Sequence, residues 1–340
     1  MDKKVINKQI RSVSNRGSML LVVFIAFVIP IRLLMNYLYN SGGYGSIWQD
    51  SKFISAFSQA GLFLIVYPVL YFLYYKYLNR QNGLRLRGVF VSSRRSKGWI
   101  LKWTVISIGL SVLFEKIILW IIGLTFGGDT AYYSGANSIL DSKSDIIGWI
   151  IYAVPIVILA PIFEELLFRA TIYRNNEPMG QLFAAVVTGT AFGMWHMNPG
   201  QIFGAGVVGI FLCLIYIKTG SIYPCIFVHF ANNLMVVSRE FFREQIGNIL
   251  LASDKKFMVL AMFHKQPIFS CLLVLCYALV IMSMIAAPIM LTVQIVKKRK
   301  GFGLNRGDFP YGALKKTLVF FSAPLTIIAF LGIILMTIFR

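Results

Sequence analysis

The sequence predicts an all-α protein: a polytopic transmembrane bundle of about nine helices. It is 57% hydrophobic and 14% charged, and its mean hydropathy is +0.71. Many of its apolar runs reach the roughly 20 residues that a membrane-spanning helix needs. Because lipid offers no hydrogen-bond partners, each span must satisfy its own backbone, which favours helices throughout.

Nine apolar runs are candidate spans. They cover residues 18–39, 53–78, 99–126, 146–174, 179–197, 200–217, 221–238, 267–296 and 318–339. The first run is longer than the roughly 7–15 apolar residues of a signal peptide, and no small-residue cleavage site follows it. We therefore expect it to be a transmembrane helix.

The polar residues divide these runs into three units. Residues 1–145 form an N-terminal unit of three spans with basic loops. Residues 146–238 form a core of four spans that holds nearly all of the candidate chemistry. Residues 239–340 form a C-terminal extension with two further spans, joined by a basic, Gly-rich loop that we expect to be irregular.

The distribution of Lys and Arg predicts the orientation. Residues 1–17 carry five of them, 79–98 six and 297–316 seven, whereas 40–52 and 127–145 carry one each. With nine spans, all three basic blocks fall on one side, which the positive-inside rule makes cytoplasmic. We therefore expect a multi-pass membrane protein with a cytoplasmic N-terminus and an external C-terminus. Because the sequence carries no retrieval signal for the endoplasmic reticulum, we expect a bacterial plasma membrane.

The net charge of +20 thus belongs to loops that face anionic lipid headgroups, and no nucleic-acid partner is expected. Segment 239–266 is an exception, with five basic and three acidic residues on the external side. We expect it to be an interfacial helix. The four cysteines lie in apolar runs without a CxxC pair, so neither a disulfide framework nor a thiolate zinc site is expected.

Two adjacent glutamates, Glu164 and Glu165, lie in the fourth apolar run. A charged side chain at membrane depth costs at least ~2.5 kcal/mol, which makes it a functional-site candidate. Arg169 follows Glu165 by four residues, so the two share a helix face and can form an ion pair. Glu164 is rotated by about 100° and is left to face another partner. A charge network that only locks helices together is the alternative; the second, unpaired glutamate favours function.

Two of the three histidines, His196 and His229, lie in the apolar runs that follow. Phe192 lies one turn before His196 and can pack against its ring. Asn233 lies one turn after His229, so both can reach a single oxygen. A lone histidine near a helix end is more often interfacial than catalytic, and this is our interpretation of His264.

The rise of ~1.5 Å per residue predicts that these polar side chains meet in one cavity below the membrane midplane, open toward the cytoplasm. Gly204, Gly206 and Gly209 in the sixth run allow its backbone to approach a neighbouring helix closely.

In this order, the motifs Glu-Glu-x-x-x-Arg, Phe-x-x-x-His and His-x-x-x-Asn resemble the CPBP intramembrane protease family. That family includes the Ras-converting CAAX endopeptidases and the bacterial Abi, or bacteriocin-immunity, proteins. The resemblance covers roughly residues 146–238 and includes Ala-Pro-Ile-Phe before Glu164 and Lys-Thr-Gly-Ser-Ile-Tyr-Pro before His229. The two extra C-terminal spans and the segment 239–266 depart from it, which leaves the substrate open.

The resemblance implies an intramembrane endopeptidase that cuts a peptide or protein substrate near the cytoplasmic face of the membrane. Glu164, helped by His196, would activate a water molecule as general base. His229 and Asn233 would donate hydrogen bonds to the oxyanion. Glu165, Arg169 and Phe192 would hold these groups in place.

This mechanism needs no cofactor, but members of the family have also been classed as metallopeptidases. Glu164, His196 and His229 are a ligand set that zinc accepts, whereas asparagine is a poor zinc ligand. The leading alternative to an enzyme is a non-catalytic scaffold that regulates an envelope or signalling protein. A proton-coupled transporter is a third hypothesis, weakened because no clear inverted repeat is present.

Overall fold

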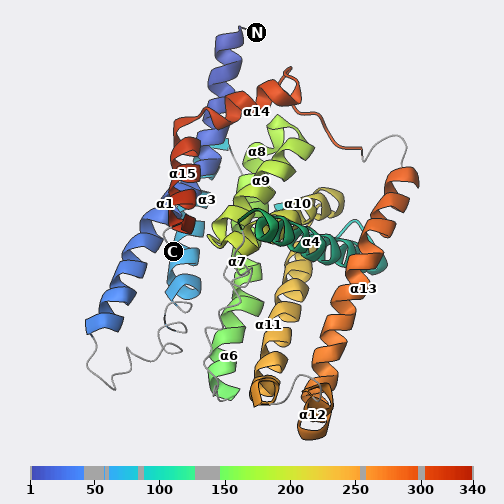
Figure 1. Ribbon diagram of the computed structural model, residues 1–340. Helices are drawn as coiled ribbons and strands as arrows, with labels where there is room; N and C mark the ends of the chain where they lie inside the picture. Colours follow the sequence, from blue (N-terminus) through green and yellow to red (C-terminus); the bar gives the residue numbers. More distant parts are fainter. Residues whose placement is uncertain are drawn as a thin grey trace.

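The computed structural model describes residues 2–41, 57, 61–82, 88–126, 146–252, 258–297 and 303–338. These residues form helices and no strand, which confirms the predicted all-α class (Figure 1). In chain order the elements are α1 (Lys3–Ser41), η2 (Leu62–Val66), α3 (Tyr67–Asn82), α4 (Lys97–Phe126), α6 (Ile146–Val154), η4 (Pro155–Leu159), α7 (Ala160–Leu167), η5 (Phe168–Tyr173), α8 (Arg174–Asn176), η6 (Glu177–Met179), α9 (Gln181–Trp195), α10 (Pro199–Thr219), α11 (Tyr223–Ala252), α12 (Met258–Lys265), α13 (Pro267–Lys297), α14 (Ala313–Phe321) and α15 (Pro324–Ile338).

Each of the nine expected spans overlaps a helix, but the structure does not confirm nine crossings. By length and composition, α1, α4, α10 and α13 can cross a membrane, and the bent pair of α14 and α15 makes a fifth candidate among the described residues. Helix α9 has 15 residues, which at ~1.5 Å per residue is shorter than the ~30 Å hydrocarbon core. The expected loop 127–145 and the beginning of the run 53–78 lie outside the described residues.

The C-terminal run 318–339, expected as one span, is bent. Helices α14 and α15 meet at 77°, so α14 lies across one end of the molecule while α15 follows α1 (Figure 1). The Ser14 hydroxyl of α1 donates to the Phe320 carbonyl (2.7 Å) and lies 2.6 Å from the Thr326 hydroxyl. The Phe320 carbonyl and the Thr326 hydroxyl, which lie near the bend, thus have a hydrogen-bond partner in α1.

The segment 239–266, expected as a separate interfacial helix, also differs. Residues 239–252 are the second half of α11, and only α12 is a separate helix. The prediction was wrong because α11 continues through Arg239, Glu240 and Arg243. The apolar run ends before these residues, but arginine and glutamate favour a helix, so the helix does not end with the run.

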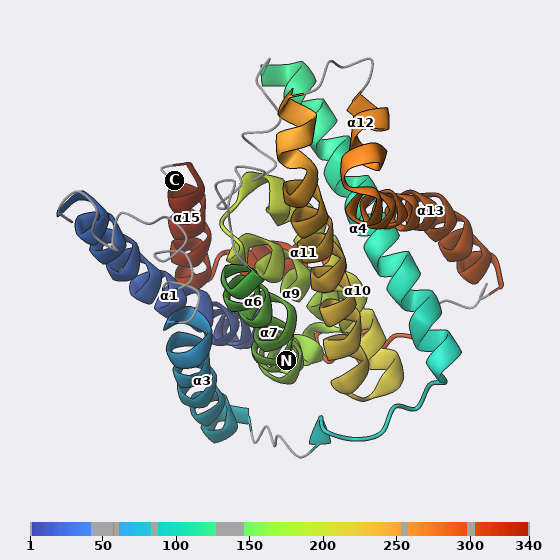
Figure 2. The same ribbon diagram turned by 90° about the horizontal axis from the view of Figure 1, so that it is seen from below.

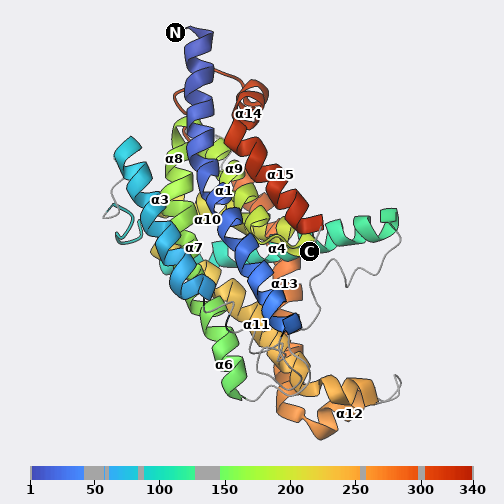
Figure 3. The same ribbon diagram turned by 90° about the vertical axis from the view of Figure 1, so that its left-hand side faces the viewer.

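The helices form three groups, seen side by side from below in Figure 2. Helices α1, α3 and α15 lie on one side, the segment α6–α11 in the middle, and α4 and α13 on the other side. In two perpendicular views (Figures 1 and 3), α4 lies across the direction of α11 and α13. The basic N-terminal turns and the segment 303–316 lie at the same end, where the Tyr311 hydroxyl donates to the Lys3 carbonyl (3.4 Å). The membrane orientation stays a prediction, as do the unit boundaries.

Helices α9 and α10 pack backbone against backbone. A Cβ atom added at Gly193 would lie 2.2 Å from the Ile202 carbonyl oxygen, and one at Gly209 would lie 2.9 Å from Cα of Gly189. This is the close approach expected for Gly209. Gly204 instead faces α4, where the Ser111 hydroxyl donates to its carbonyl (2.9 Å).

Candidate active site

Both glutamates lie on α7, a short α-helix between two π-helical stretches, η4 and η5. In η4, the N–H of Ala160 bonds to the carbonyl of Pro155, five residues back. Such π-helical turns are rare and occur frequently at functional sites. The backbone around the glutamates is therefore irregular at both ends of α7.

The side chain of Asn233 on α11 contacts the irregular backbone of η4. The N–H of Ala160 donates to the Pro155 carbonyl and is not available to the carbonyl of Ile156. The next possible backbone donor for Ile156 is residue 161, but Pro161 has no N–H. The Asn233 amide nitrogen donates to the Ile156 carbonyl at 2.9 Å instead. The amide therefore joins α11 to η4, and one of its two hydrogens is already engaged.

Glu165 is the centre of a buried ionic network. Arg169 Nη1 donates to Glu165 Oε1 (2.8 Å), which confirms the expected pair, and Arg169 Nη2 donates to the Gly209 carbonyl (3.0 Å). His229 Nδ1 lies 2.8 Å from the same Glu165 oxygen. Glu165 and Arg169 are fully buried, and His229 is 3% exposed.

The contact between His229 and Glu165 was not expected, and it orients the imidazole ring. A carboxylate only accepts hydrogen bonds, so Nδ1 carries the hydrogen and Nε2 is left for another partner. His229 Nε2 lies 3.8 Å from Glu164 Oε2. In the neutral ring, Nε2 is an acceptor, and it donates to an oxyanion only when the ring is doubly protonated.

Glu164 lies on the side of α7 that faces α1 and α3. Tyr67 of α3 is a hydrogen-bonding neighbour of its carboxyl group, and Trp195 Nε1 donates to the Tyr67 hydroxyl (2.9 Å). Phe24 of α1 stacks on Trp195, with 3.5 Å between ring centroids. Glu164 is 5% exposed and Tyr67 also 5%. A chain of polar groups thus runs from α9 through α3 to this glutamate.

Tyr67 and Trp195 were missed from the sequence. Tyr67 stands in the second apolar run without a spaced polar partner, so nothing local distinguishes it from other aromatic residues there. Trp195 directly precedes His196, and its indole N–H was the available signal, because a buried indole usually has a hydrogen-bond partner.

His196 is half-buried at the end of α9. Its Nδ1 lies 2.9 Å from the Phe192 carbonyl, and the Phe192 ring meets both imidazoles edge-on, at 5.1 Å from His196 and 5.4 Å from His229. The guanidinium of Arg169 lies 4.7 Å from the same ring. His196 is an electrostatic neighbour of Glu164, but no hydrogen bond joins the two in the described structure.

We expected an open cavity around these side chains, and the structure corrects this prediction. Glu164 and His229 are almost fully enclosed, because α1, α3 and α15 pack against the side of α7 and α9 that carries Glu164. His264 lies on α12, in another part of the molecule (Figure 1).

The alternative metal site stays a hypothesis. Within the described ranges, no group of three or more His, Cys, Asp or Glu side chains is spaced to hold a metal ion. The Nδ1 atoms of His196 and His229 are engaged by a carbonyl and by Glu165, which leaves Nε2 of each ring as the atom for a ligand, as in histidines that bind a metal. No step of the chemistry below is assigned to a metal.

Comparison with known proteins gives a matching family model and a curated relative. Residues 146–235 match the family model described as "Type II CAAX prenyl endopeptidase Rce1-like". A Bacillus subtilis (strain 168) protein named "Putative membrane peptidase YdiL" is 29% identical over 139 residues, which are 38% of this chain and 57% of that relative. No solved structure matches significantly. The segment from α6 into α11, with both glutamates and both histidines, is the matched part.

Proposed function

We propose that the chain, which is similar to CAAX-type membrane proteases over residues 146–235, is an intramembrane endopeptidase in which Glu164 activates water. The substrate is a peptide or protein in or at the membrane. The observation that carries the proposal is the unequal setting of the two glutamates: Arg169 pairs with Glu165 and leaves Glu164 to act.

Glu164 acts as the general base. Glu165 is held through its Oε1 atom by Arg169 and His229, whereas Glu164 has a neutral hydroxyl and an imidazole as neighbours. In this proposal the Tyr67 hydroxyl orients the carboxyl group, and the carboxylate takes a proton from the attacking water. Positioned general acid–base groups typically contribute about 10²–10⁴-fold in rate.

His229 and Asn233 act on the other side of the reacting carbonyl. Glu165 holds the His229 ring as the third group in a base–orienter arrangement, so that Nε2 points to the space beside Glu164. In its doubly protonated form, His229 donates to the developing oxyanion. The second N–H of Asn233 adds another donor, and one such donor contributes about 3–4 kcal/mol.

His196 completes the arrangement by holding the water. Its Nδ1 is fixed by the Phe192 carbonyl, so Nε2 is the atom available for a ligand. The Phe192 ring packs against both imidazoles and keeps their relative orientation.

The membrane peptidome tests this proposal. Cells that carry the parent protein are compared with cells that carry Glu164→Ala, with Glu115→Ala as the control, because Glu115 is a membrane-helix glutamate that pairs with Lys116 away from the site. We expect peptides that accumulate with the parent and the control and disappear with Glu164→Ala. Identical peptidomes in all three strains would reject the protease and favour the regulatory scaffold.

A further inference from the structure

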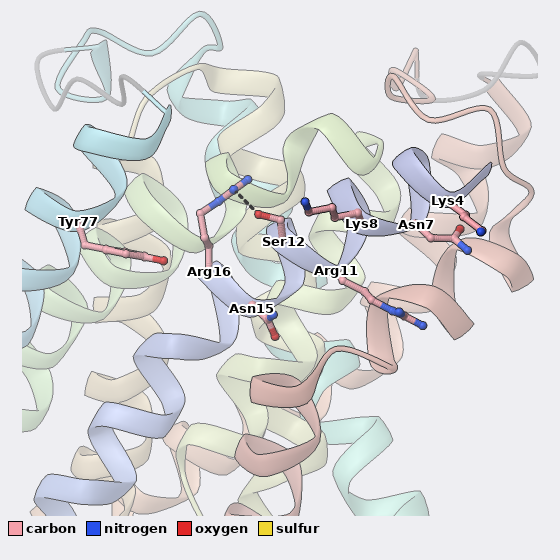
Figure 4. Close-up of a pocket in the computed structure, with 8 residues that line it drawn as sticks. All are labelled: Lys4, Asn7, Lys8, Arg11, Ser12, Asn15, Arg16 and Tyr77. Atoms are coloured by element: carbon pink, nitrogen blue, oxygen red, sulfur yellow. Dashed lines mark hydrogen bonds between the residues drawn. The ribbon is translucent and has the colours of Figure 1, made fainter. Parts of the chain in front are cut away.

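The first turns of α1 line a pocket that the protease chemistry does not use. The pocket has a volume of about 510 Å³, and Figure 4 shows its lining side chains. Seven come from one face of α1 and one from α3: Lys4, Asn7, Lys8, Arg11, Ser12, Asn15, Arg16 and Tyr77. The pocket therefore lies between the polar beginning of α1 and the second half of α3.

Four of these side chains are cations and none is acidic. No ion pair within the described ranges involves Lys4, Lys8, Arg11 or Arg16. Two carboxylates lie nearby: Asp2 accepts from the Lys4 backbone N–H (3.0 Å), and Asp308 lines a second pocket together with Ser12 and Arg16. Four cations against these two acids leave a net positive charge, so an anion is the ligand that the cluster favours.

The two arginines are held in place by neutral partners. Arg16 Nε donates to Asn175 Oδ1 (3.1 Å) and its Nη1 to the Ser12 hydroxyl (2.9 Å). Arg11 Nε donates to the Ser322 hydroxyl (3.1 Å). These bonds fix the guanidinium planes and leave further N–H groups for a ligand. Fixed guanidinium groups are well suited to phosphate oxygens.

The position of the pocket identifies the source of the phosphate. Directly after Arg16, α1 becomes apolar, and farther along it exposes Phe27, Leu33 and Leu34 as a lipid-facing surface. Tyr77 is an aromatic residue with a polar tip, of the kind enriched at membrane–water interfaces. The pocket therefore adjoins the polar end of an apolar helix, where we expect the headgroup phosphates of a bilayer.

We propose that this pocket binds the phosphate group of an anionic membrane lipid, with Lys4, Lys8 and Arg11 as its ligands and Arg16 as the residue that joins the site to the core. Asn175, which accepts from Arg16, also donates to the Val13 carbonyl (2.9 Å). It lies in α8, at the end of the helical segment that carries Glu164. Lipid binding would therefore stabilise α1 against that segment. The proposal rests on these contacts and not on the protease activity.

Calorimetric titration of the purified full-length protein tests it. The probe is dihexanoyl phosphatidylglycerol at concentrations where the lipid is monomeric, so no bilayer surface attracts the protein in general. The double variant Lys4→Gln/Lys8→Gln removes two exposed charges from the pocket. Because both ammonium groups would be direct ligands of the phosphate, we expect binding to weaken by at least about tenfold.

The matched control is Lys3→Gln/Lys97→Gln, which removes two exposed lysines outside the pocket. We expect its affinity to equal that of the parent, and dihexanoyl phosphatidylcholine to bind neither protein. An equal loss in both double variants would overturn the proposal, because it would indicate diffuse attraction without a site. Binding of inorganic phosphate without binding of the lipid would also overturn it and assign the pocket to free phosphate.

Discussion

The two sides of α7 give two adjacent glutamates different surroundings. On the side of α10 and α11, Glu165 is fully buried and accepts from Arg169 and His229 through one oxygen. On the side of α1 and α3, Glu164 meets the Tyr67 hydroxyl, and from α11 only the far nitrogen of His229 approaches it, at 3.8 Å. The comparison teaches that neighbouring groups of one chemical type acquire separate roles from the helices they face.

The largest expected effect is on the α3-facing side. Glu164→Gln keeps the size and the hydrogen bond with Tyr67 but removes the base, so cleavage should fall by at least about 10²-fold while folding is retained. The rate is measured on purified protein and normalised to folded protein. Glu115→Gln should cleave like the parent. If Glu164→Gln cleaves equally well, the catalytic assignment fails.

The α10-facing side should respond in stability first. Glu165→Gln leaves Arg169 buried without its counter-charge, and losing one partner of a buried pair costs about 3–5 kcal/mol. The free energy of unfolding should fall accordingly, with lower yield and lower activity. Adding Arg169→Met removes the orphaned charge and should restore part of the stability. A stable but inactive Glu165→Gln protein would instead give this residue a direct part in catalysis.

Tyr67→Phe is expected to have a smaller effect and to test positioning. The change leaves Trp195 Nε1 and Glu164 without the hydroxyl between them, so kcat should fall by about tenfold with KM nearly unchanged. The unsatisfied buried indole should cost about 1–3 kcal/mol.

The matched control for Tyr67 lies one turn along α3. The Tyr71 hydroxyl is buried and has no hydrogen-bond partner in the described structure, so Tyr71→Phe should leave kcat unchanged and should not lower stability. Equal effects of the two substitutions would show that Tyr67 contributes only packing.

The smallest effect is expected from chelators. If Glu164 and the imidazoles act without a metal, treatment with a chelator followed by dialysis should leave the cleavage rate nearly unchanged and no stoichiometric zinc in the protein. One zinc per chain, with activity that is lost on removal and recovered on zinc addition, would contradict this expectation.

The sequence predicted what lies within one helix. The pair of Glu165 and Arg169 follows from a spacing of four residues, and so does the packing of Phe192 on His196. The bonds of His229 to Glu165 and of Asn233 to Ile156 join residues 64 and 77 positions apart. They depend on the packing of α11 against α7, which no local spacing encodes.

The span count shows the same limit for the fold. Hydropathy shows where an apolar run begins and ends but not how its helix is oriented in space. It therefore predicted a helix at α4 but not that α4 lies across α11 and α13. Hydropathy also predicted 318–339 as one span. In the structure the chain bends within this run, and the Phe320 carbonyl near the bend accepts from the Ser14 hydroxyl of α1. Both features depend on contacts with distant helices.

The two π-helical stretches around α7 make segment length part of the chemistry. A π-helical turn holds one residue more than an α-helical turn, so deleting one residue in 155–159 would restore the regular pattern. The residues before the deletion would then rotate by about 100° relative to Glu164, and the Ile156 carbonyl would leave Asn233. This segment should therefore tolerate side-chain exchange far better than a change of helical phase.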